Sequence, residues 1–345
     1  MATERGRIQI SGFDPDRVTE RESLSDWSDD SSTETMSRWK RAGVRFVHNY
    51  SAMFGVLIVV LMSLAAIFAR PISIEGFTVQ PFSLAPYDPE TILYLDPSSD
   101  VGIYSAPTPD HPMGTDQNGR DLFSRVLIGG RYSISIGFIV VGLTASFGMV
   151  YGAIAGYYGG WVDEILMRIV DTIFAFPGLV LALVIVTMLG KGYWELILAF
   201  SLFGWAGYAR IIRGEILQVK QQEYVTAAKA LGAGDFSVIF RHIVPNAMAP
   251  LIVQASLSIG TVVIGVAALG FLGLGMPPGT AEWGTMLDST RQTLIQGPGG
   301  SIPWWATVYP GGAIFLFVMS MNMIGDGVND ALDAQEVGNV RQGGG

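Results

Sequence analysis

The sequence predicts an all-α integral membrane protein with six transmembrane helices, and three observations support this fold class. Half of the 345 residues are hydrophobic, 15% are charged and the mean hydropathy is +0.39, values typical of a membrane protein. Six apolar stretches approach or reach the roughly 20 residues that a helix needs to cross a bilayer. Charged residues concentrate between these stretches. We therefore expect the lipid bilayer to surround most of the chain.

The six predicted spans begin at residue 50. They are Tyr50 to Ala69, Tyr132 to Tyr158, Thr172 to Leu189, Tyr193 to Ala209, Ala247 to Pro278 and Trp304 to Gly325. The fourth is short and carries Glu195 near one end, so the sequence defines its limits less sharply. No short basic segment opens the chain ahead of the first span, so we expect a retained helix rather than a cleaved signal peptide. Residues 132–325 would then form a core of five helices.

Residues 1–49 are expected to be an acidic, disordered tail followed by a basic segment beside the membrane. Met1 to Ser37 hold nine acidic and four basic residues and show almost no apolar periodicity. The whole chain has a net charge of −9. Because a charge of this sign repels nucleic acid, we expect no nucleic-acid partner.

Basic residues near the span ends predict that both chain ends are cytoplasmic. Four of them, Arg38, Lys40, Arg41 and Arg45, precede the first span, and five more, Arg210, Arg213, Lys220, Lys229 and Arg241, lie between the fourth and fifth. With six spans both groups fall on one side, which the positive-inside rule makes cytoplasmic. Residues 326–345 would be a cytoplasmic tail. Residues 70–131, with eight of the seventeen prolines, would be an irregular extracytoplasmic loop.

Glycines recur at every fourth position in and just after the second span. They are Gly148, Gly152, Gly156 and Gly160. On a helix this spacing places them on one face, where another backbone can approach closely, so we expect helix packing there. The glycines of "GFLGLGMPPG" lack both the G-x-G-x-x-G spacing and a preceding strand, so they indicate a packed or broken helix end rather than a nucleotide loop.

Four charges lie just before the third span and are candidates for a gating or membrane-boundary role. They are Asp163, Glu164, Arg168 and Asp171. Helical spacing allows Arg168 to pair with either Glu164 or Asp171. We interpret the group first as a helix-end cluster that marks the cytoplasmic boundary. Pro177, further along the same span, is interpreted as a kink.

The sequence predicts no catalytic residue and no metal site. It contains no cysteine, and its three histidines, His48, His111 and His242, lie far apart. It has neither G-x-S-x-G nor the phosphate-binding pattern G-x-x-x-x-G-K-[ST]. We therefore expect no cofactor on this chain, and any ATP and Mg²⁺ would be bound by other subunits.

The loop from 210 to 246 is charged yet rich in helix-forming residues, between two strongly apolar spans. We expect a helix outside the membrane, broken by Gly232 and Gly234. Ala227, Ala228 and Leu231 share one face of it, with Tyr224 one turn earlier. An ordinary amphipathic surface helix would show the same periodicity, but small residues on that face would also let another protein approach the backbone.

The segment "TAAKALGAGDFSVIFRHIVPN" resembles the cytoplasmic signature loop of binding-protein-dependent ABC importer permeases. The signature of that family is E-A-A, three residues, G, and about a dozen residues later a proline. In this chain the corresponding positions are Thr226, Ala227, Ala228, Gly232 and Pro245. Thr226 stands where the pattern favours Glu. Further segments follow in the order seen in the C-type permease of the dipeptide/oligopeptide/nickel class: 111–137, 155–183, 204–217, 271–278, 282–287 and 322–333. The tail before residue 38 and the loop from Arg70 to Asp110 are not covered.

The resemblance implies the type I ABC importer permease fold, known as the MetI-like fold, in a multi-pass protein of the cell membrane. It implies a sister permease in a heterodimer, two ABC ATPase subunits and an extracytoplasmic substrate-binding protein as partners. The loop would form a coupling helix on an ATPase, and the residues that carry this role would be Glu223, Tyr224, Thr226, Ala227, Ala228, Leu231 and Gly232. The end of the coupling loop would be His242, Pro245 and Asn246.

The expected function is that of a permease subunit forming half of a translocation pathway for dipeptides or oligopeptides. The same class also moves nickel complexes and sugars, so nickel complexes or oligosaccharides remain alternatives. A secondary transporter is the alternative from a different class. It would need a coupling-ion site at mid-membrane, and the strong spans contain no central acidic residue.

Overall fold

A computed structural model describes residues 38–74, 77–96, 100–291, 293 and 302–333. The chain divides into two units, 1–44 and 45–345. The first unit contributes only the beginning of helix α2 (Arg38–His48) to the described residues. The predicted disordered tail, 1–37, and most of the predicted C-terminal tail, 334–345, lie outside them.

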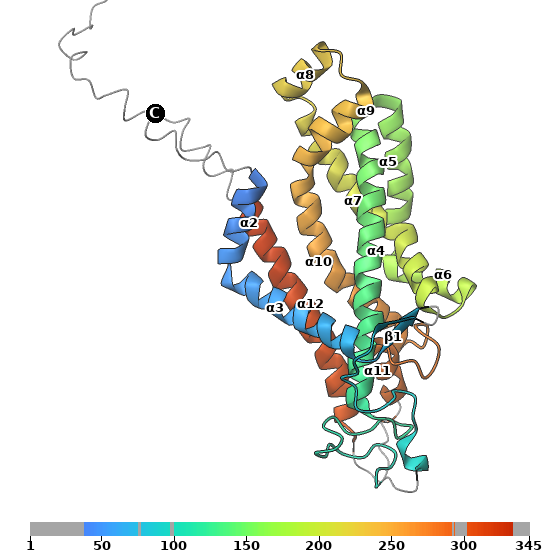
Figure 1. The fold of residues 1–345 in the computed structure, drawn as a ribbon. Coiled ribbons are helices and arrows are strands. Elements are labelled where there is room, and N and C mark those ends of the chain that lie inside the picture. The colour runs from blue at the N-terminus through green and yellow to red at the C-terminus, as the bar shows by residue number, and fades with distance from the viewer. Residues whose placement is uncertain (1–37, 75–76, 97–99, 292, 294–301, 334–345) are drawn as a thin grey trace, which may run out of the picture. The chain divides into compact units, whose positions relative to one another are not determined.

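The regular structure described in the second unit is mainly helical (Figure 1), and a long irregular segment lies between α3 and α4. The helices are α3 (Tyr50–Phe68), α4 (Leu122–Tyr158), α5 (Gly160–Phe174), α6 (Gly178–Leu189), α7 (Tyr193–Val219), α8 (Glu223–Ala230), α9 (Asp235–Ser237), the π-helix η4 (Val238–Ile243), α10 (Val244–Phe271), α11 (Trp283–Arg291) and α12 (Trp305–Asp333). The exceptions to the all-α prediction are short: a 3-10 turn, η3 (Leu93–Leu95), and a hairpin of β1 (Ile72–Ile74) and β2 (Phe77–Gln80).

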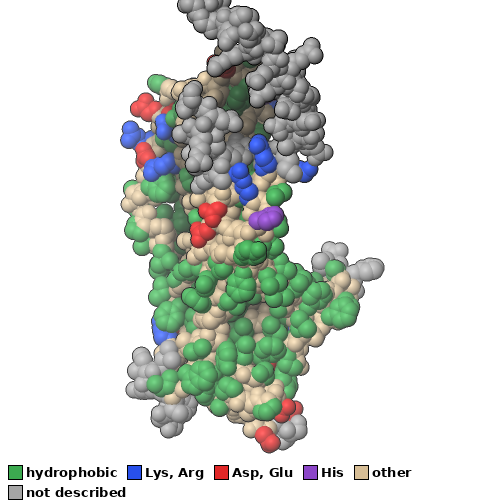
Figure 2. Space-filling model, turned by 90° about the vertical axis from the view of Figure 1, so that its left-hand side faces the viewer, with side chains coloured by type: hydrophobic (Ala, Val, Ile, Leu, Met, Phe, Trp, Pro, Cys, Tyr) green, Lys and Arg blue, Asp and Glu red, His purple; other side chains and the backbone are tan. Residues whose placement is uncertain are grey.

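Five helices of the described chain are long and apolar enough to cross a membrane. They are α3, α4, α7, the continuous helix Asp235–Phe271 and α12, and the bent pair α5 and α6 makes a sixth span if it is counted as one. The predicted membrane fold of six spans is confirmed to that extent. Figure 2 shows the face on which α3 and α12 lie, where hydrophobic side chains cover a wide area of the surface.

Several helices extend beyond the apolar runs that predicted them. Helix α4 begins at Leu122 rather than Tyr132, because the Asp121 side chain caps it by accepting the Ser124 N–H at 2.8 Å. Helix α7 continues to Val219, and α12 continues through part of the predicted tail to Asp333. Apolar runs mark only the stretch of a helix that lies in hydrocarbon, so they miss its polar extensions.

The predicted third span is not one helix. Helix α5 ends at Phe174, α6 begins at Gly178, and their axes differ by 82°. Pro177 stands directly before α6 and cannot donate a backbone N–H, so the chain breaks there rather than kinking gently. The predicted fifth span also ends earlier, at Phe271, because Gly273 adopts a positive φ of 73° and two prolines follow.

The glycine-lined face of α4 lies against α7, which is the most extensive helix pairing in the described chain. A Cβ atom on Gly148 would lie 2.6 Å from the Trp205 carbonyl oxygen, and one on Gly156 would lie 3.0 Å from the Arg213 carbonyl oxygen. A Cβ on Gly152 would overlap the Ala209 backbone. Gly160 does not belong to this seam, since the helix ends at Tyr158 and nothing lies within 4 Å of the position its Cβ would take.

Candidate functional site

The loop between α7 and α10 forms a helical projection from the bundle (Figure 1). Helix α8 is followed by Gly232, whose φ of +85° needs a glycine, and by α9 and η4, which lead into α10. The Ala233 N–H donates to the Ala228 carbonyl at 3.1 Å and so closes the end of α8. The predicted helix and its break at Gly232 are therefore present. We call residues 223–246 the coupling segment from here on.

One side of the coupling segment is buried and the other is exposed to an unusual degree. Val225 is completely buried against η4, where it packs with Val238 and Ile243. Leu231 is 90% exposed and Phe236 is 76% exposed. Of the residues expected to form the docking face, Ala228 is partly buried and the others are exposed: Glu223, Tyr224, Thr226, Ala227, Leu231 and Gly232. Sequence reasoning missed Phe236, because it lies beyond the glycine break.

The C-terminal end of α4 holds the coupling segment on both sides of Gly232. The Tyr157 hydroxyl donates to Asp235 Oδ1 at 2.5 Å, and the Lys229 ammonium lies 4.5 Å from the centre of the Tyr157 ring. Lys220 donates to the Gly156 carbonyl at 2.7 Å. The sequence offered one weak signal for Tyr157, its place beside the last packed glycine of α4. These contacts connect α8 and α9 directly to α4.

The end of the coupling segment is a wide helical turn that runs into α10. Pro245 lies in the first turn of α10 and lacks an N–H, so a regular α-helical bond cannot continue through it. The π-helix η4 precedes it and makes room for the proline ring. Asn246 donates its side-chain amide to the His242 carbonyl at 2.7 Å. His242 and Asn246 thus serve the local helix geometry in the described structure.

The charges of α5 pair with α7 and not with one another. Asp163 receives two bonds from the Arg213 guanidinium, at 2.7 and 2.5 Å, and Asp171 receives one from Arg210 at 2.7 Å. Helical spacing allowed Arg168 to pair with Glu164 or Asp171, but Asp171 binds Arg210 instead, because α7 lies alongside α5. Glu164 and Arg168 are exposed. These ion pairs join α5 to the part of α7 that leads into the coupling segment.

The opposite end of α4 enters a cluster of buried polar side chains. His111 Nδ1 lies 2.9 Å from Asp121 Oδ1, and Arg120 Nε donates to Asp116 Oδ2 at 2.8 Å. Arg125 donates to the carbonyls of Pro89 at 2.8 Å and Gly279 at 3.1 Å. The predicted irregular loop is thus fixed to the helix bundle by charged groups that are themselves buried.

Glu282 is the second anchor of this cluster and is completely buried. Its carboxylate accepts the Ser133 hydroxyl and the Gly284 N–H at 2.9 Å each, and the Thr285 N–H at 2.8 Å. It therefore holds the beginning of α11 against α4. We refer to the buried group of His111, Asp116, Arg120, Asp121, Arg125 and Glu282 as the buried cluster.

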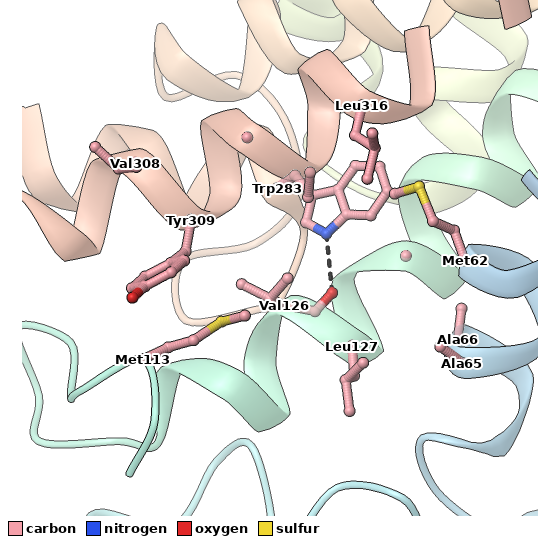
Figure 3. A pocket seen from close by; sticks show the side chains of 13 residues that line it. Met62, Ala65, Ala66, Met113, Val126, Leu127, Trp283, Val308, Tyr309 and Leu316 are labelled. Carbon is pink, nitrogen blue, oxygen red and sulfur yellow. Dashed lines mark hydrogen bonds between the residues drawn. The ribbon is translucent and has the colours of Figure 1, made fainter. Parts of the chain in front are cut away.

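A cavity of about 410 Å³ lies beside the buried cluster, between α3, α4, α11 and α12 (Figure 3). Its lining is aliphatic, thioether and aromatic, with Met62, Met113 and Leu316 among the contributors. Two polar groups occur in the lining side chains, the Tyr309 hydroxyl and the Trp283 indole N–H, and the latter already donates to the Val126 carbonyl at 2.9 Å. This cavity suits an apolar group and offers little to a polar solute.

Two family models match the chain. The binding-protein-dependent transport system inner membrane component matches residues 148–336, and the N-terminal TM domain of oligopeptide transport permease C matches residues 37–107. The second match covers the first span and most of the proline-rich loop, which the sequence motifs had left uncovered. Together they include the coupling segment, the α4–α7 seam from Gly148 onward and α12.

Individual relatives resemble the chain over most of its length. The glutathione transport system permease protein GsiD of Shigella dysenteriae is 40% identical over 295 residues, 86% of this chain and 90% of that protein. The oligopeptide transport system permease protein OppC of Bacillus subtilis is 39% identical over 302 residues, 88% of this chain and 91% of that protein. GsiD of Escherichia coli O157:H7 is 39% identical over 295 residues, again 86% and 90% of the two chains.

Proposed function

This chain belongs to the family of binding-protein-dependent transport system inner membrane components, and on that premise we propose that it contributes one half of the translocation pathway of a peptide importer. It is a multi-pass inner membrane protein and a permease subunit. ATP hydrolysis and substrate capture lie with separate subunits, an ATPase and a binding protein. What is proposed below concerns the substrate, the subunit arrangement and the surface that couples them.

Dipeptides or oligopeptides are the substrates we propose. The relatives are named for the transport of glutathione, itself a short peptide, and of oligopeptides. The match to an oligopeptide permease model supports the same class. Nickel complexes and oligosaccharides remain alternatives, and uptake assays with each solute would separate them.

The coupling segment would be the surface on which an ATPase docks, and the exposure of Leu231 is the observation that carries this proposal. Leu231 is 90% exposed and lies outside the candidate spans, and Phe236, 76% exposed, lies at the very beginning of the span Asp235–Phe271, so both apolar side chains stand at this end of the bundle without a covering partner in the described chain. The small side chains of Ala227 and Ala228 would let the partner reach the helix backbone. The basic residues of this end, such as Arg241 and Lys220, support a cytoplasmic position for it and for both chain ends.

The complete complex would contain a sister permease, two ATPases and an extracytoplasmic binding protein. ATP and Mg²⁺ would be bound by the ATPases, and this chain would bind no cofactor. Closure of the ATPase pair would shift α8, and the contacts of Tyr157 would pass that shift to α4. Helix α4 has 37 residues, so it is on the order of 55 Å long and extends beyond a hydrocarbon core of about 30 Å. It would therefore connect the ATPase side to the buried cluster on the outer side.

The test is co-purification of the tagged chain from mild detergent, followed by mass spectrometry of the bound subunits. We expect the wild type to retain a sister permease and the ATPases. Leu231→Glu and Ala228→Glu should lose the ATPases and keep the sister permease. The control is Leu95→Glu, which changes a leucine that is 64% exposed outside the spans and away from the coupling segment.

Two outcomes would contradict the proposal. If Leu231→Glu and Ala228→Glu retained the ATPases at the wild-type level, the coupling segment would not be their docking surface. If the purified chain alone supported solute uptake in liposomes without ATP, a secondary transporter would replace the importer.

A further inference from the structure

A second cavity, of about 330 Å³, lies among α4, α6, α7 and α10, which qualify as membrane spans, α6 only as part of its bent pair with α5. Unlike the cavity beside the buried cluster, it is lined by four hydroxyl groups, those of Thr144, Tyr208, Ser258 and Thr261. Its lining includes no charged side chain. The remaining walls are aromatic, aliphatic and glycine residues. Its chemistry therefore favours a neutral group that forms hydrogen bonds.

The Tyr208 hydroxyl is the strongest indication that this cavity takes a ligand. The side chain of Tyr208 is 4% exposed, and its hydroxyl lies close to those of Ser258 and Thr144, but no described atom meets the distance and angle of a regular hydrogen bond with it. A buried hydroxyl without a partner is uncommon, because burial removes its bonds to water. By contrast, Thr144 already donates to the Val140 carbonyl at 2.8 Å. Tyr208 thus retains both donor and acceptor capacity within the cavity.

Helix α10 extends the polar lining beyond the cavity. Gln254, Ser258 and Thr261 are spaced i, i+4 and i+7, so they share one face of the helix. The Gln254 amide donates to the Ser258 hydroxyl at 3.0 Å, and Gln254 and Thr261 are exposed. Polar side chains within a membrane span usually face a partner or a water-filled path rather than lipid. We call these three residues the α10 polar stripe.

We propose that the hydroxyl-lined cavity and the α10 polar stripe form the part of the solute path that binds the main-chain amides of a passing peptide. Hydroxyl and carboxamide groups can donate to a peptide C=O and accept from a peptide N–H. Main-chain amides are common to all peptides, so such a site would tolerate different side chains. This inference rests on the proposed import of peptides, and it assigns specific residues to the solute path.

The first test is cysteine labelling. The chain contains no cysteine, so a single introduced cysteine is its one site for a thiol reagent. Ser258→Cys and Thr261→Cys are assembled with all partner subunits in proteoliposomes, and the rate of modification by a charged maleimide is measured on the tagged chain. The control is Leu61→Cys, at a leucine that is 56% exposed on α3, another apolar span. Modification requires the thiolate, which forms in water and not in hydrocarbon.

We expect both path variants to react at least about tenfold faster than Leu61→Cys, because only a hydrated site ionises the thiol readily. Trialanine delivered by the binding protein with ATP should slow their reaction and leave Leu61→Cys unchanged. Rates equal to that of the control would overturn the proposal. Fast reaction without protection by trialanine would overturn the assignment of a peptide site.

The second test removes one hydroxyl at a time. In Tyr208→Phe we expect trialanine uptake per ATP hydrolysed to fall about threefold to tenfold, which corresponds to the loss of one hydrogen bond. Subunit assembly and basal ATP hydrolysis should match the wild type. Tyr309→Phe, which removes a hydroxyl from the apolar cavity, should have no effect. Peptides with acidic and basic side chains should show the same loss as trialanine.

Wild-type uptake in Tyr208→Phe would overturn this inference and leave the proposed function intact. A wild-type complex that imports no peptide at all would instead overturn the proposed function. The two failures are therefore distinguishable in a single set of assays.

Discussion

The two ends of α4 reverse the usual rule for which side chains are buried. At the Tyr157 end, the coupling segment exposes Leu231 and Phe236. At the Asp121 end, the buried cluster encloses carboxylates and guanidinium groups, and Asp121 and Glu282 are both completely buried. Exposed apolar groups gain free energy only when a partner covers them, whereas the buried charges are already paired within the chain. Under the proposed function, the first end would be completed by another subunit, whereas the second is already a fixed frame.

The largest expected effect is the loss of Glu282. Glu282→Ala would leave the donors of Ser133, Gly284 and Thr285 without their acceptor in a buried site, so we expect a loss of about 3 kcal/mol or more in the free energy of unfolding. The measurement is the thermal unfolding midpoint in detergent. Glu223→Ala, at the exposed beginning of α8, should change stability by no more than about 0.5 kcal/mol. Equal effects at the two ends would refute the comparison.

The contact between α4 and α7, which lies between the two ends of α4, should be nearly as sensitive to added side-chain volume. Gly152→Ala would press a methyl group into the Ala209 backbone, and we expect it to cost about 1–3 kcal/mol. Gly142→Ala is the matched control on the same helix, because nothing lies within 4 Å of its Cβ position, and it should be neutral or stabilise by up to about 1 kcal/mol. Unfolding of the purified variants measures both. A neutral Gly152→Ala would show that α4 and α7 separate easily.

Tyr157→Phe should reduce transport while sparing stability and assembly. The change removes the bond to Asp235 and keeps the ring beneath Lys229, so we expect peptide uptake to fall about tenfold or more, as for a hydrogen bond to a charged group. The ATPases should remain bound in co-purification. A double-mutant cycle with Asp235→Asn tests the link, since the second change should add little to the first. Fully additive losses would mean that the two residues act separately.

The smallest expected effect comes from the other contact of Tyr157. Lys229→Gln would remove an exposed cation over an aromatic ring, a contact of about 0.5–1 kcal/mol, and should lower uptake about twofold to fivefold. Lys191→Gln, at an exposed lysine between α6 and α7, serves as the control and should transport normally. Uptake assays on the reconstituted complex compare the two. A loss in Lys191→Gln of the same size would point to overall charge instead of the Tyr157 contact.

The sequence predicted the spans well and their ends poorly, for a physical reason. Hydrophobicity records contact with hydrocarbon, so it located each candidate span of the described residues yet missed the beginning of α4 at Leu122 and the end of α12 at Asp333. The break beside Pro177 was anticipated only as a kink, because proline predicts a disturbed helix but not an angle of 82°.

The sequence motif located the coupling segment, but it did not predict the contacts that attach this segment to the rest of the chain. Gly232 lies where the chain turns, as expected from its sequence position. The anchors Tyr157 and Asp235 are far apart in the sequence, and so are Asp163 and Arg213. Pairing of this kind depends on which helices are neighbours, and that information is not contained in the periodicity of any single helix.

The bent pair of α5 and α6 has a consequence for how cells make this protein. Helix α6 has 12 residues, so it is about 18 Å long and spans little more than half of a hydrocarbon core of about 30 Å. Irregular backbone within a hydrocarbon core is tolerated only against protein or water, and residues 174–178 are exposed in the described chain, so the proposed sister permease would cover the bend. Copies synthesised in excess of that subunit would present the bend to lipid and become substrates for membrane proteases. The amount of this chain in a cell should therefore follow the supply of its partner more closely than its own rate of translation.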